Sequence, residues 1–122
     1  MSRHGTRILV VEDFVSFRSL VVRVLGSEGY EAVGAGTVSD ATALCASEHF
    51  DLLITDYTVP GGTGTEIARE AFDAMPDLRV LFMSGGLEST LDLDVPGART
   101  AFLQKPFDLD VLTAVVRELL AG

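Results

Sequence analysis

The chain has no tryptophan and a single cysteine among its 122 residues. Cys45 cannot form a disulfide within the chain, and no CxxC pair or histidine stands at a metal-binding spacing from it. Because Cys45 falls on the apolar side of an expected helix, we interpret it as a buried structural thiol. The scarcity of cysteine excludes a fold held together by disulfides.

Long apolar runs are also missing. No stretch approaches the roughly 18 consecutive apolar residues that a membrane-spanning helix needs. The opening residues, Met1-Ser2-Arg3-His4-Gly5, lack the apolar core of a secretory signal. We therefore expect a cytoplasmic protein without membrane contact, with residues 1–5 as a disordered or artificial tail and residues 6–122 as one domain.

Positive charge is scarce, because 9 lysines and arginines face 18 aspartates and glutamates, for a formal net charge of -9. Direct binding to nucleic acid needs a basic surface, so this balance argues against it. The same charge disfavours anionic membrane surfaces. An acidic chain is compatible with binding a cation or the basic face of a partner.

Short apolar runs alternate with segments of helical periodicity, and this alternation defines the expected fold. Strands are expected at 7–11, 31–35, 51–56, 79–83 and 99–103. Helices should follow each strand, with Thr37 starting the second and Asp108 capping the last. The fourth helix should lie within residues 87–96, where the weak signal predicts a short or mobile one. The pattern predicts an α/β fold: a doubly wound, five-stranded parallel sheet with helices on both faces.

Polar residues stand where these strands end: Glu12 and Asp13 after the first, Asp56 at the end of the third, Ser84 after the fourth and Lys105 after the fifth. Parallel strands bring all these ends to one edge of the sheet. Taken singly, each has an ordinary explanation. Asp13 could cap a helix, Asp56 and Ser84 could form turns, and Lys105 could be a solvated surface cation.

Together they favour one kind of chemistry. Three carboxylates at one edge repel one another unless a positive group lies between them. Mg²⁺ suits a site of few carboxylates completed by waters and phosphate oxygens. With the charge of Lys105 and the hydroxyl of Ser84, such a site could place a phosphoryl group on Asp56.

Two other phosphate-binding patterns do not fit. Gly61-Gly62-Thr63-Gly64 lacks the lysine and the spacing of a P-loop, and the first strand ends in Glu12-Asp13 instead of a glycine-rich dinucleotide motif. His4 and His49 have no partner at catalytic or metal spacing and are interpreted as structural.

The ordered set of motifs resembles the receiver domain of bacterial two-component response regulators over essentially the whole chain. The matching segments are Ile8-Leu9-Val10-Val11-Glu12-Asp13, Asp51-Leu52-Leu53-Ile54-Thr55-Asp56, Val59-Pro60-Gly61 with Gly64, Met83-Ser84-Gly85 and Phe102-Leu103-Gln104-Lys105-Pro106-Phe107. The resemblance implies a flavodoxin-like fold with strand order 2-1-3-4-5.

The resemblance also implies a role for each site residue. Asp56 matches the phospho-accepting aspartate and Asp13 a direct ligand of Mg²⁺. Glu12 matches the first acidic residue, which usually acts on the metal through a water. The backbone carbonyl of Thr58 matches the third protein ligand.

A second group of matches concerns switching. Ser84 matches the hydroxyl that moves onto the phosphoryl group, and Phe102 the aromatic residue that then changes rotamer. Lys105 matches the lysine of the family motif, whose bond to Pro106 is cis.

Three positions depart from the family pattern. Glu12 replaces the commoner aspartate, and Phe102 replaces the commoner tyrosine and so has no hydroxyl. The region that begins at Gly85-Gly86 departs most, although it forms part of the family's usual output surface.

The implied function is a signalling switch. A sensor histidine kinase or a histidine phosphotransfer protein would present phosphohistidine to Asp56 in a Mg²⁺-dependent reaction. The domain would catalyse only its own phosphorylation and dephosphorylation, and it would pass the change to an output partner. It would be a single-domain regulator or a receiver from a longer protein such as a hybrid sensor kinase.

Two alternatives belong to other classes. One is a phosphorylation-independent interaction module, which retention of every site residue disfavours. The other is an aspartyl-phosphate phosphatase. Such phosphatases usually carry a second acid two residues after the nucleophile, and Thr58 stands there instead.

Overall fold

The computed structural model describes residues 5–121. Five parallel strands form the main sheet in the order β2-β1-β3-β6-β7, which is the predicted order 2-1-3-4-5 under the structure's own numbering. Their bounds are β1 Arg7–Val11, β2 Glu31–Ala35, β3 Leu52–Asp56, β6 Arg79–Ser84 and β7 Arg99–Gln104. The predicted flavodoxin-like fold is confirmed. The predicted tail at residues 1–5 falls outside the described residues except for Gly5.

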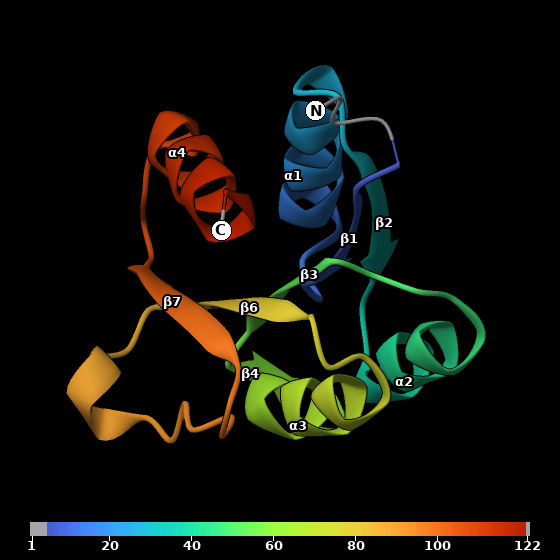
Figure 1. Cartoon of the computed structure of the whole chain (residues 1–122). Coiled ribbons are helices and arrows are strands. Elements are labelled where there is room, and N and C mark those ends of the chain that lie inside the picture. Colours follow the sequence, from blue (N-terminus) through green and yellow to red (C-terminus); the bar gives the residue numbers. More distant parts are fainter. Residues whose placement is uncertain (1–4, 122) are drawn as a thin grey trace.

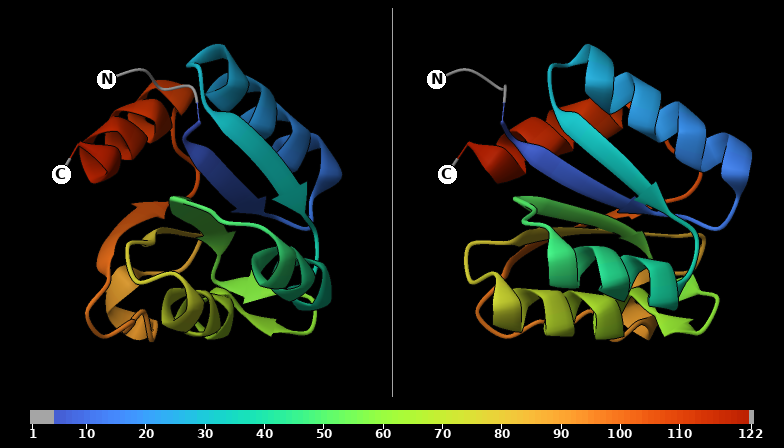
Figure 2. Two further views of the ribbon diagram at one scale, coloured as in Figure 1. Left: turned by 45° about the vertical axis from the view of Figure 1, so that its right-hand side comes forward. Right: turned by 90° about the vertical axis from the view of Figure 1, so that its right-hand side faces the viewer.

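Helices cover both faces of this sheet (Figure 1). The α1 (Val15–Ser27) and α4 (Leu109–Leu120) helices lie on one face, and α2 (Val38–Ser47) and α3 (Gly64–Ala74) lie on the other. The two further views in Figure 2 show the same three layers. Within residues 5–121, no helix has the length and apolar character required to span a membrane.

Burial on both faces explains why the three central strands, β1, β3 and β6, are mostly apolar. Leu9, Leu53 and Phe82 point into the core beneath α2 and α3, whereas Ile54 and Leu81 point into the core beneath α1 and α4. All five residues of β3 are buried. A strand enclosed between two helical layers keeps no polar face, so its sequence loses the alternation of a half-buried strand.

The register of the strands brings their carboxyl ends to one edge of the sheet. Val11 of β1 pairs with Thr55 of β3, and Asp56 pairs with Met83 of β6. At the other side of β6, Ser84 pairs with Gln104, the last residue of β7. Residues 12, 13, 56, 84 and 105 therefore emerge along the same edge.

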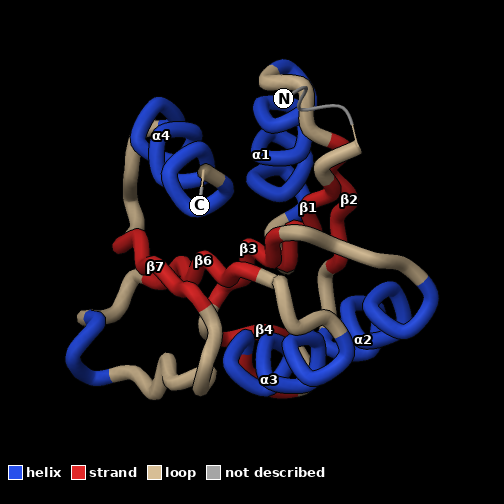
Figure 3. Tube along the Cα trace, viewed as in Figure 1, coloured by secondary structure: helices blue, strands red, loops and turns tan. Residues whose placement is uncertain are grey.

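The short fourth helix predicted between β6 and β7 is reduced to a single 3₁₀ turn. Within residues 85–98 the structure has one short 3₁₀ turn, η1 (Glu88–Thr90), followed by an extended loop at residues 91–95 and a turn at Pro96-Gly97 (Figure 3). Apolar and acidic residues alternate along this chain, and Leu93 and Val95 pack against the core. Alternation with a period of two suits an extended segment, because it sends every second side chain to the same side.

Side chains of α3 hold this extended segment. Arg69 Nε donates to the carbonyl of Asp94 at 2.8 Å, and its Nη2 lies 3.2 Å from Asp92 Oδ2. The Thr65 hydroxyl donates to the carbonyl of Asp92 at 2.6 Å. These contacts give residues 92–94 hydrogen-bond partners that a helix would have supplied internally.

The loop after β3 contains a small hairpin that the sequence patterns did not predict. Its strands, β4 (Thr58–Val59) and β5 (Gly62–Thr63), are antiparallel and flank Pro60-Gly61. Gly61 has a φ of +101°, a conformation that residues with a Cβ rarely adopt. Two-residue strands are too short to produce a periodic pattern.

Helix caps were predicted with mixed success. Thr37 Oγ1 accepts from the Asp40 amide at 3.0 Å, so the predicted start of α2 is confirmed. Asp108 does occupy the N-cap position of α4, but its side chain makes no capping hydrogen bond. The predicted N-cap position of Asp108 is therefore confirmed, although the side chain does not cap the helix.

Candidate functional site

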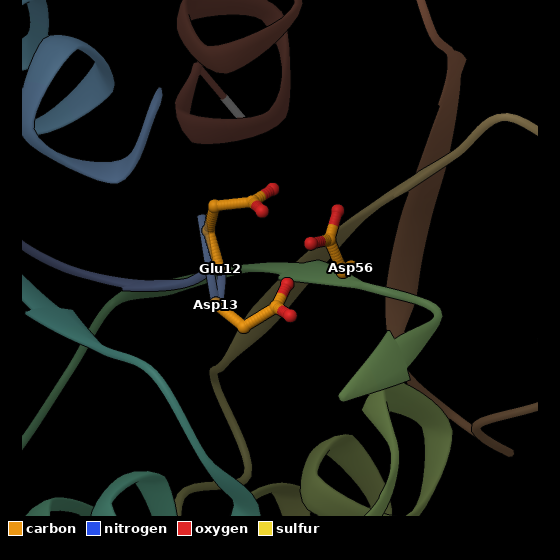
Figure 4. A group of neighbouring side chains, drawn as sticks. All are labelled: Glu12, Asp13 and Asp56. Atoms are coloured by element: carbon orange, nitrogen blue, oxygen red, sulfur yellow. The ribbon is translucent and has the colours of Figure 1, made fainter. Parts of the chain in front are cut away.

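Three carboxylates converge where β1 and β3 end. Glu12 and Asp13 follow β1 directly, and Asp56 is the last residue of β3 (Figure 4). One oxygen of each lies within 4.8 Å of the others. Glu12 and Asp56 are 2% and 7% exposed, whereas Asp13 is exposed. Two of the three negative charges are thus held away from water, which makes a nearby cation favourable.

Lys105 bridges the two buried carboxylates. Its Nζ donates to Glu12 Oε2 at 2.7 Å and lies 2.7 Å from Asp56 Oδ1. Among the described residues, Asp56 Oδ1 has this ionic contact but no hydrogen bond of good geometry. A buried carboxylate oxygen in that condition can still accept a metal ion or a covalent bond.

The charges in this cluster shift one another's protonation. Burial and, second, the Glu12 carboxylate together raise the pKa of Asp56 to about 7, although Lys105 acts to lower it. Burial also acts to raise the pKa of Glu12, but hydrogen bonds with Asp56, Lys105 and the Phe14 amide outweigh it and leave that pKa lowered. Burial acts to lower the pKa of Lys105, yet the two carboxylates leave it raised. Lys105 is therefore a permanent cation, and Asp56 is the carboxylate that most needs a further positive charge.

Asp13 takes no part in capping the following helix. Phe14 is the N-cap residue of α1, and no side chain caps that end. Within residues 5–121, no hydrogen bond or ion pair involves the Asp13 carboxylate. The capping explanation for Asp13 fails, and its oxygens remain available to a ligand.

A cavity of about 230 Å³ lies beside Asp56, and Ser84, Thr58 and Lys105 are among its lining residues. Ser84 Oγ accepts from the Gly86 amide at 3.0 Å. Thr58, in β4, is exposed at the cavity wall. The structure therefore gathers around Asp56 each predicted site residue except Phe102.

Phe102 lies elsewhere. It is in the middle of β7, pairs with Phe82, and lines a separate cavity of about 260 Å³ between β7 and α4. Phe102 stands two residues before Gln104, which is the β7 residue that pairs with Ser84. It is therefore set back along the strand from the edge that carries the carboxylate cluster.

A further apolar cavity opens on the other side of Lys105. It measures about 310 Å³, and its apolar lining residues are Phe14, Phe17, Pro106 and Phe107. Phe14 is 66% exposed. Phe17 packs edge-on against Phe107 with 5.9 Å between ring centroids. Sequence reasoning missed this surface, although Phe14 directly follows Asp13 and Phe107 stands two residues after Lys105.

Cys45 and the two histidines were predicted to be structural residues. Cys45 is only partly buried, but it packs against the core, and burial raises the pKa of its thiol to about 11. His49 is exposed, and His4 lies outside the described residues. The peptide bond between Lys105 and Pro106 is cis, as the resemblance implied.

Comparison with known proteins identifies the family. A model described as "Response regulator receiver domain" matches residues 8–117. The response regulator receiver protein CpdR of Brucella abortus is 34% identical over 118 residues, which cover 95% of this chain and 98% of CpdR. The sensor kinase CckA of the same organism is 32% identical over 116 residues, 93% of this chain but 12% of the kinase.

A solved structure agrees in fold. The response regulator TrrA of Thermotoga maritima, in complex with Mg²⁺-BeF, superposes with a TM-score of 0.81 at 32% identity and covers 94% of this chain and 99% of its own. The sheet order, the acidic cluster at its carboxyl edge and these matches lead to one conclusion. The chain belongs to the response regulator receiver domain family of two-component systems.

Proposed function

We propose that Asp56 of this receiver domain accepts a phosphoryl group from a phosphohistidine. The observation that carries the proposal is the position of Asp56 between the Lys105 ammonium and a cavity of about 230 Å³. Its Oδ1 is buried and has an ionic contact with Lys105, but no hydrogen bond of good geometry among the described residues. The raised pKa of Asp56 would leave part of the carboxylate protonated near neutral pH, so a bound cation would also favour the nucleophilic, ionised form.

The donor set supports a divalent cation at this edge. Three carboxylates with oxygens within 4.8 Å form a hard, oxygen-rich site that suits Mg²⁺. Asp13 and Asp56 would bind it directly with the Thr58 carbonyl, and Glu12 would act through a water. When bound, the cation would neutralise charge on the phosphoryl oxygens.

In the transfer, an Asp56 carboxylate oxygen attacks phosphorus in line with the phosphorus–nitrogen bond of the phosphohistidine. A phosphorus–oxygen bond forms, and the bonding pair of the phosphorus–nitrogen bond leaves with the imidazole. Lys105 pairs with a phosphoryl oxygen and so stabilises the charge that builds up on it. Water later attacks phosphorus, which releases phosphate and restores Asp56.

Ser84 would change its hydrogen bonds when Asp56 is phosphorylated. Its hydroxyl accepts from the Gly86 amide at 3.0 Å in the unphosphorylated chain. A phosphoryl group on Asp56 would attract that hydroxyl as a donor, and Phe102, two residues before the β7 partner of Ser84, would change rotamer in response. Because Gly86 begins the segment before β7, the loss of this bond would disturb the surface that passes the signal on.

The donor would be a sensor histidine kinase or a histidine phosphotransfer protein in the cytoplasm. The apolar cavity formed by Phe14, Phe17 and Phe107 adjoins Lys105 and is open to such a partner. An apolar helix carrying the phosphohistidine would bury these rings and bring the phosphoryl group to Asp56. The domain would act as a signalling switch, with its own dephosphorylation as its only other reaction.

The proposal is tested by incubating the protein with Mg²⁺ and acetyl phosphate and measuring its intact mass. We expect one added phosphoryl group, which should be absent from the Asp56→Asn variant and when Mg²⁺ is chelated. A chain that never gains a phosphoryl group would be a phosphorylation-independent interaction module. Sustained hydrolysis of many phosphomonoesters would instead favour the phosphatase, and either result would overturn the proposal.

A further inference from the structure

One arginine of α1 forms a hydrogen bond with the backbone of the segment that carries Glu12 and Asp13. Arg18 stands in the first turns of α1, and its Nη1 donates to the backbone carbonyl of Glu12 at 2.9 Å. The side chain therefore reaches back over the turn that leads from β1 into α1. It approaches the acidic residues through the backbone and makes no hydrogen bond with their carboxylate oxygens.

Two glycines, one in β2 and one directly after it, make room for this arginine. A Cβ built on Gly36 would lie 2.7 Å from Arg18 Nη1, and one built on Gly34 would lie 3.0 Å from Arg18 Cδ. Neither glycine has a positive φ, so backbone conformation does not demand glycine there. Because Gly34 and Gly36 have no side chains, they leave the space through which Arg18 passes.

The carbonyl that Arg18 holds belongs to the peptide bond between Glu12 and Asp13. Because a peptide unit is planar, fixing this oxygen also fixes the Cα of Asp13. The Glu12 amide is already bonded to the carbonyl of Ala35 at 3.0 Å, and the Glu12 side chain accepts from the Phe14 amide at 3.0 Å. Glu12 is thus held through its amide, its carbonyl and its side chain.

Asp13 depends on this backbone support. Its carboxylate is exposed, and within the described part of the chain no side chain or amide positions it. A ligand without a partner of its own keeps its place only if its backbone is rigid. Partners that orient metal ligands from outside commonly change metal affinity by about 10- to 100-fold when they are removed.

We infer that Arg18 is a positioning residue for the cation site, and that Gly34 and Gly36 form the slot through which it fixes Asp13. The inference rests on the proposed function, in which Asp13 binds the cation. Arg18 makes no contact with the phosphoryl group and acts only through the Glu12–Asp13 peptide.

The test is a titration with Mg²⁺ alone at constant ionic strength, followed through the amide resonances of Asp13 and Tyr57 in ¹⁵N NMR spectra. Arg18→Met keeps the aliphatic stem over Gly34 but cannot donate to the Glu12 carbonyl. We expect its Kd for Mg²⁺ to rise about 10-fold. Arg23→Met removes the same charge from an exposed position of α1 and should leave the Kd within about twofold of the parent value.

Gly36→Ala supplies an independent arm, because its Cβ would displace the guanidinium while Arg18 remains. It should weaken Mg²⁺ binding as Arg18→Met does, and the double variant should bind no more weakly than the weaker single variant. Thermal denaturation separates a merely structural role, since a lowered Tm with an unchanged Kd would overturn the inference. If Arg18→Met does not fold, the Gly36→Ala titration decides by the same criterion.

The two levels of the proposal can fail separately. If the parent chain shows no shifts at Asp13 and Tyr57 with Mg²⁺, the proposed cation site itself is wrong. If the parent binds and both Arg18→Met and Gly36→Ala bind equally well, the site stands and the role of Arg18 is refuted.

Discussion

Burial of the Asp56 carboxylate sets the electrostatic state of the site at the scale of single residues. The folded chain holds a proton on Asp56 more tightly than the unfolded chain, because burial raises the Asp56 pKa from its ordinary 3.8 to about 7. Stability from this group is fully present below pH 4 and is lost as the pH rises through about 7. Glu12 has the opposite effect, because its pKa is lowered by folding. Its contribution to stability is present above its ordinary pKa of 4.5 and is lost as the pH falls below that value.

Without divalent cations, the raised pKa of Asp56 should make the stability of the protein depend on pH. Its free energy of unfolding should decrease between pH 4 and pH 7.5, and Asp56→Asn should remove most of that decrease. At pH 8 the asparagine variant should melt about 5 °C higher than the parent, because a neutral amide pays no cost for burial of a charge. Thermal melts in chelator across this pH range measure both effects.

Asp13→Asn is the matched control, since it removes a carboxylate of the same cluster and leaves Asp56 in place. It should retain the decrease between pH 4 and pH 7.5. Parallel curves for the parent and Asp56→Asn would mean that Asp56 is not held in the surroundings described above.

At the scale of elements, the start of α3 is pressed against the site. The Gly64 amide donates to the Tyr57 carbonyl at 2.7 Å, and a Cβ on Gly64 would overlap the Asp56 carbonyl oxygen and lie 2.7 Å from Thr55 Cγ2. Gly64→Ala should therefore destabilise the fold by about 2–4 kcal/mol, since backbone atoms cannot move aside as a flexible side chain can. Urea denaturation measures the change.

The control for this prediction is Gly26→Ala, in the last turn of α1. A Cβ there meets nothing within 4 Å, and alanine favours a helix by about 0.5–1 kcal/mol over glycine. Gly26→Ala should leave stability unchanged or raise it. Equal effects of the two substitutions would refute the close packing of α3 on Asp56.

A third prediction concerns the extended segment at residues 91–95. Arg69 ties it to α3 through Asp92 and Asp94, and both members of the ion pair are largely exposed. Arg69→Ala should change global stability by less than about 1 kcal/mol while hydrogen exchange in the segment becomes faster. Arg117→Ala, which removes the surface pair with Glu28, serves as the control and should leave exchange there unaltered. Unchanged exchange in Arg69→Ala would show that Arg69 does not hold the segment.

These elements also show what the sequence could reveal. Runs such as Arg7–Val11 and Glu31–Ala35 predicted their strands to the residue, because parallel strands are short, rich in apolar residues and bounded by turn formers. The fourth helix was expected because an alternating α/β pattern calls for one. The local signal contradicted it, since Leu91, Leu93 and Val95 alternate with Asp92 and Asp94. Arg69 and Thr65 hold the segment before β7 through tertiary contacts, and such contacts leave no pattern in the local sequence.

At the scale of the whole molecule, the fold assembles the site from distant parts of the chain. Glu12, Asp56 and Lys105 could be placed together from the sequence, because parallel strands share one carboxyl edge. The aromatic cavity beside Lys105 and the slot for Arg18 could not, since each depends on how α1 packs against its neighbours. The distance between Phe102 and the cluster likewise required the register of β6 and β7.

The fourth prediction concerns the molecule's response to cations. Mg²⁺ should bind the folded chain and not the unfolded one, so at about 100 times its Kd it should stabilise the protein by about 2–3 kcal/mol. Since a net charge of -9 makes any salt stabilising, the comparison is with NaCl at equal ionic strength. Asp13→Asn should abolish the difference between the two salts in thermal melts. A parent protein that responds identically to both salts would contradict a specific cation site.

The position of the phosphoryl group tests the central claim most directly. The protein is phosphorylated with acetyl phosphate and Mg²⁺, the acyl phosphate is reduced with borohydride, and the modified residue is located by peptide mass spectrometry. Reduction converts a phosphorylated aspartate to homoserine, and we predict that product at position 56 alone. Homoserine at Asp13 or Asp51, or a phosphoryl group found on His49, would contradict the assignment of Asp56 as the acceptor.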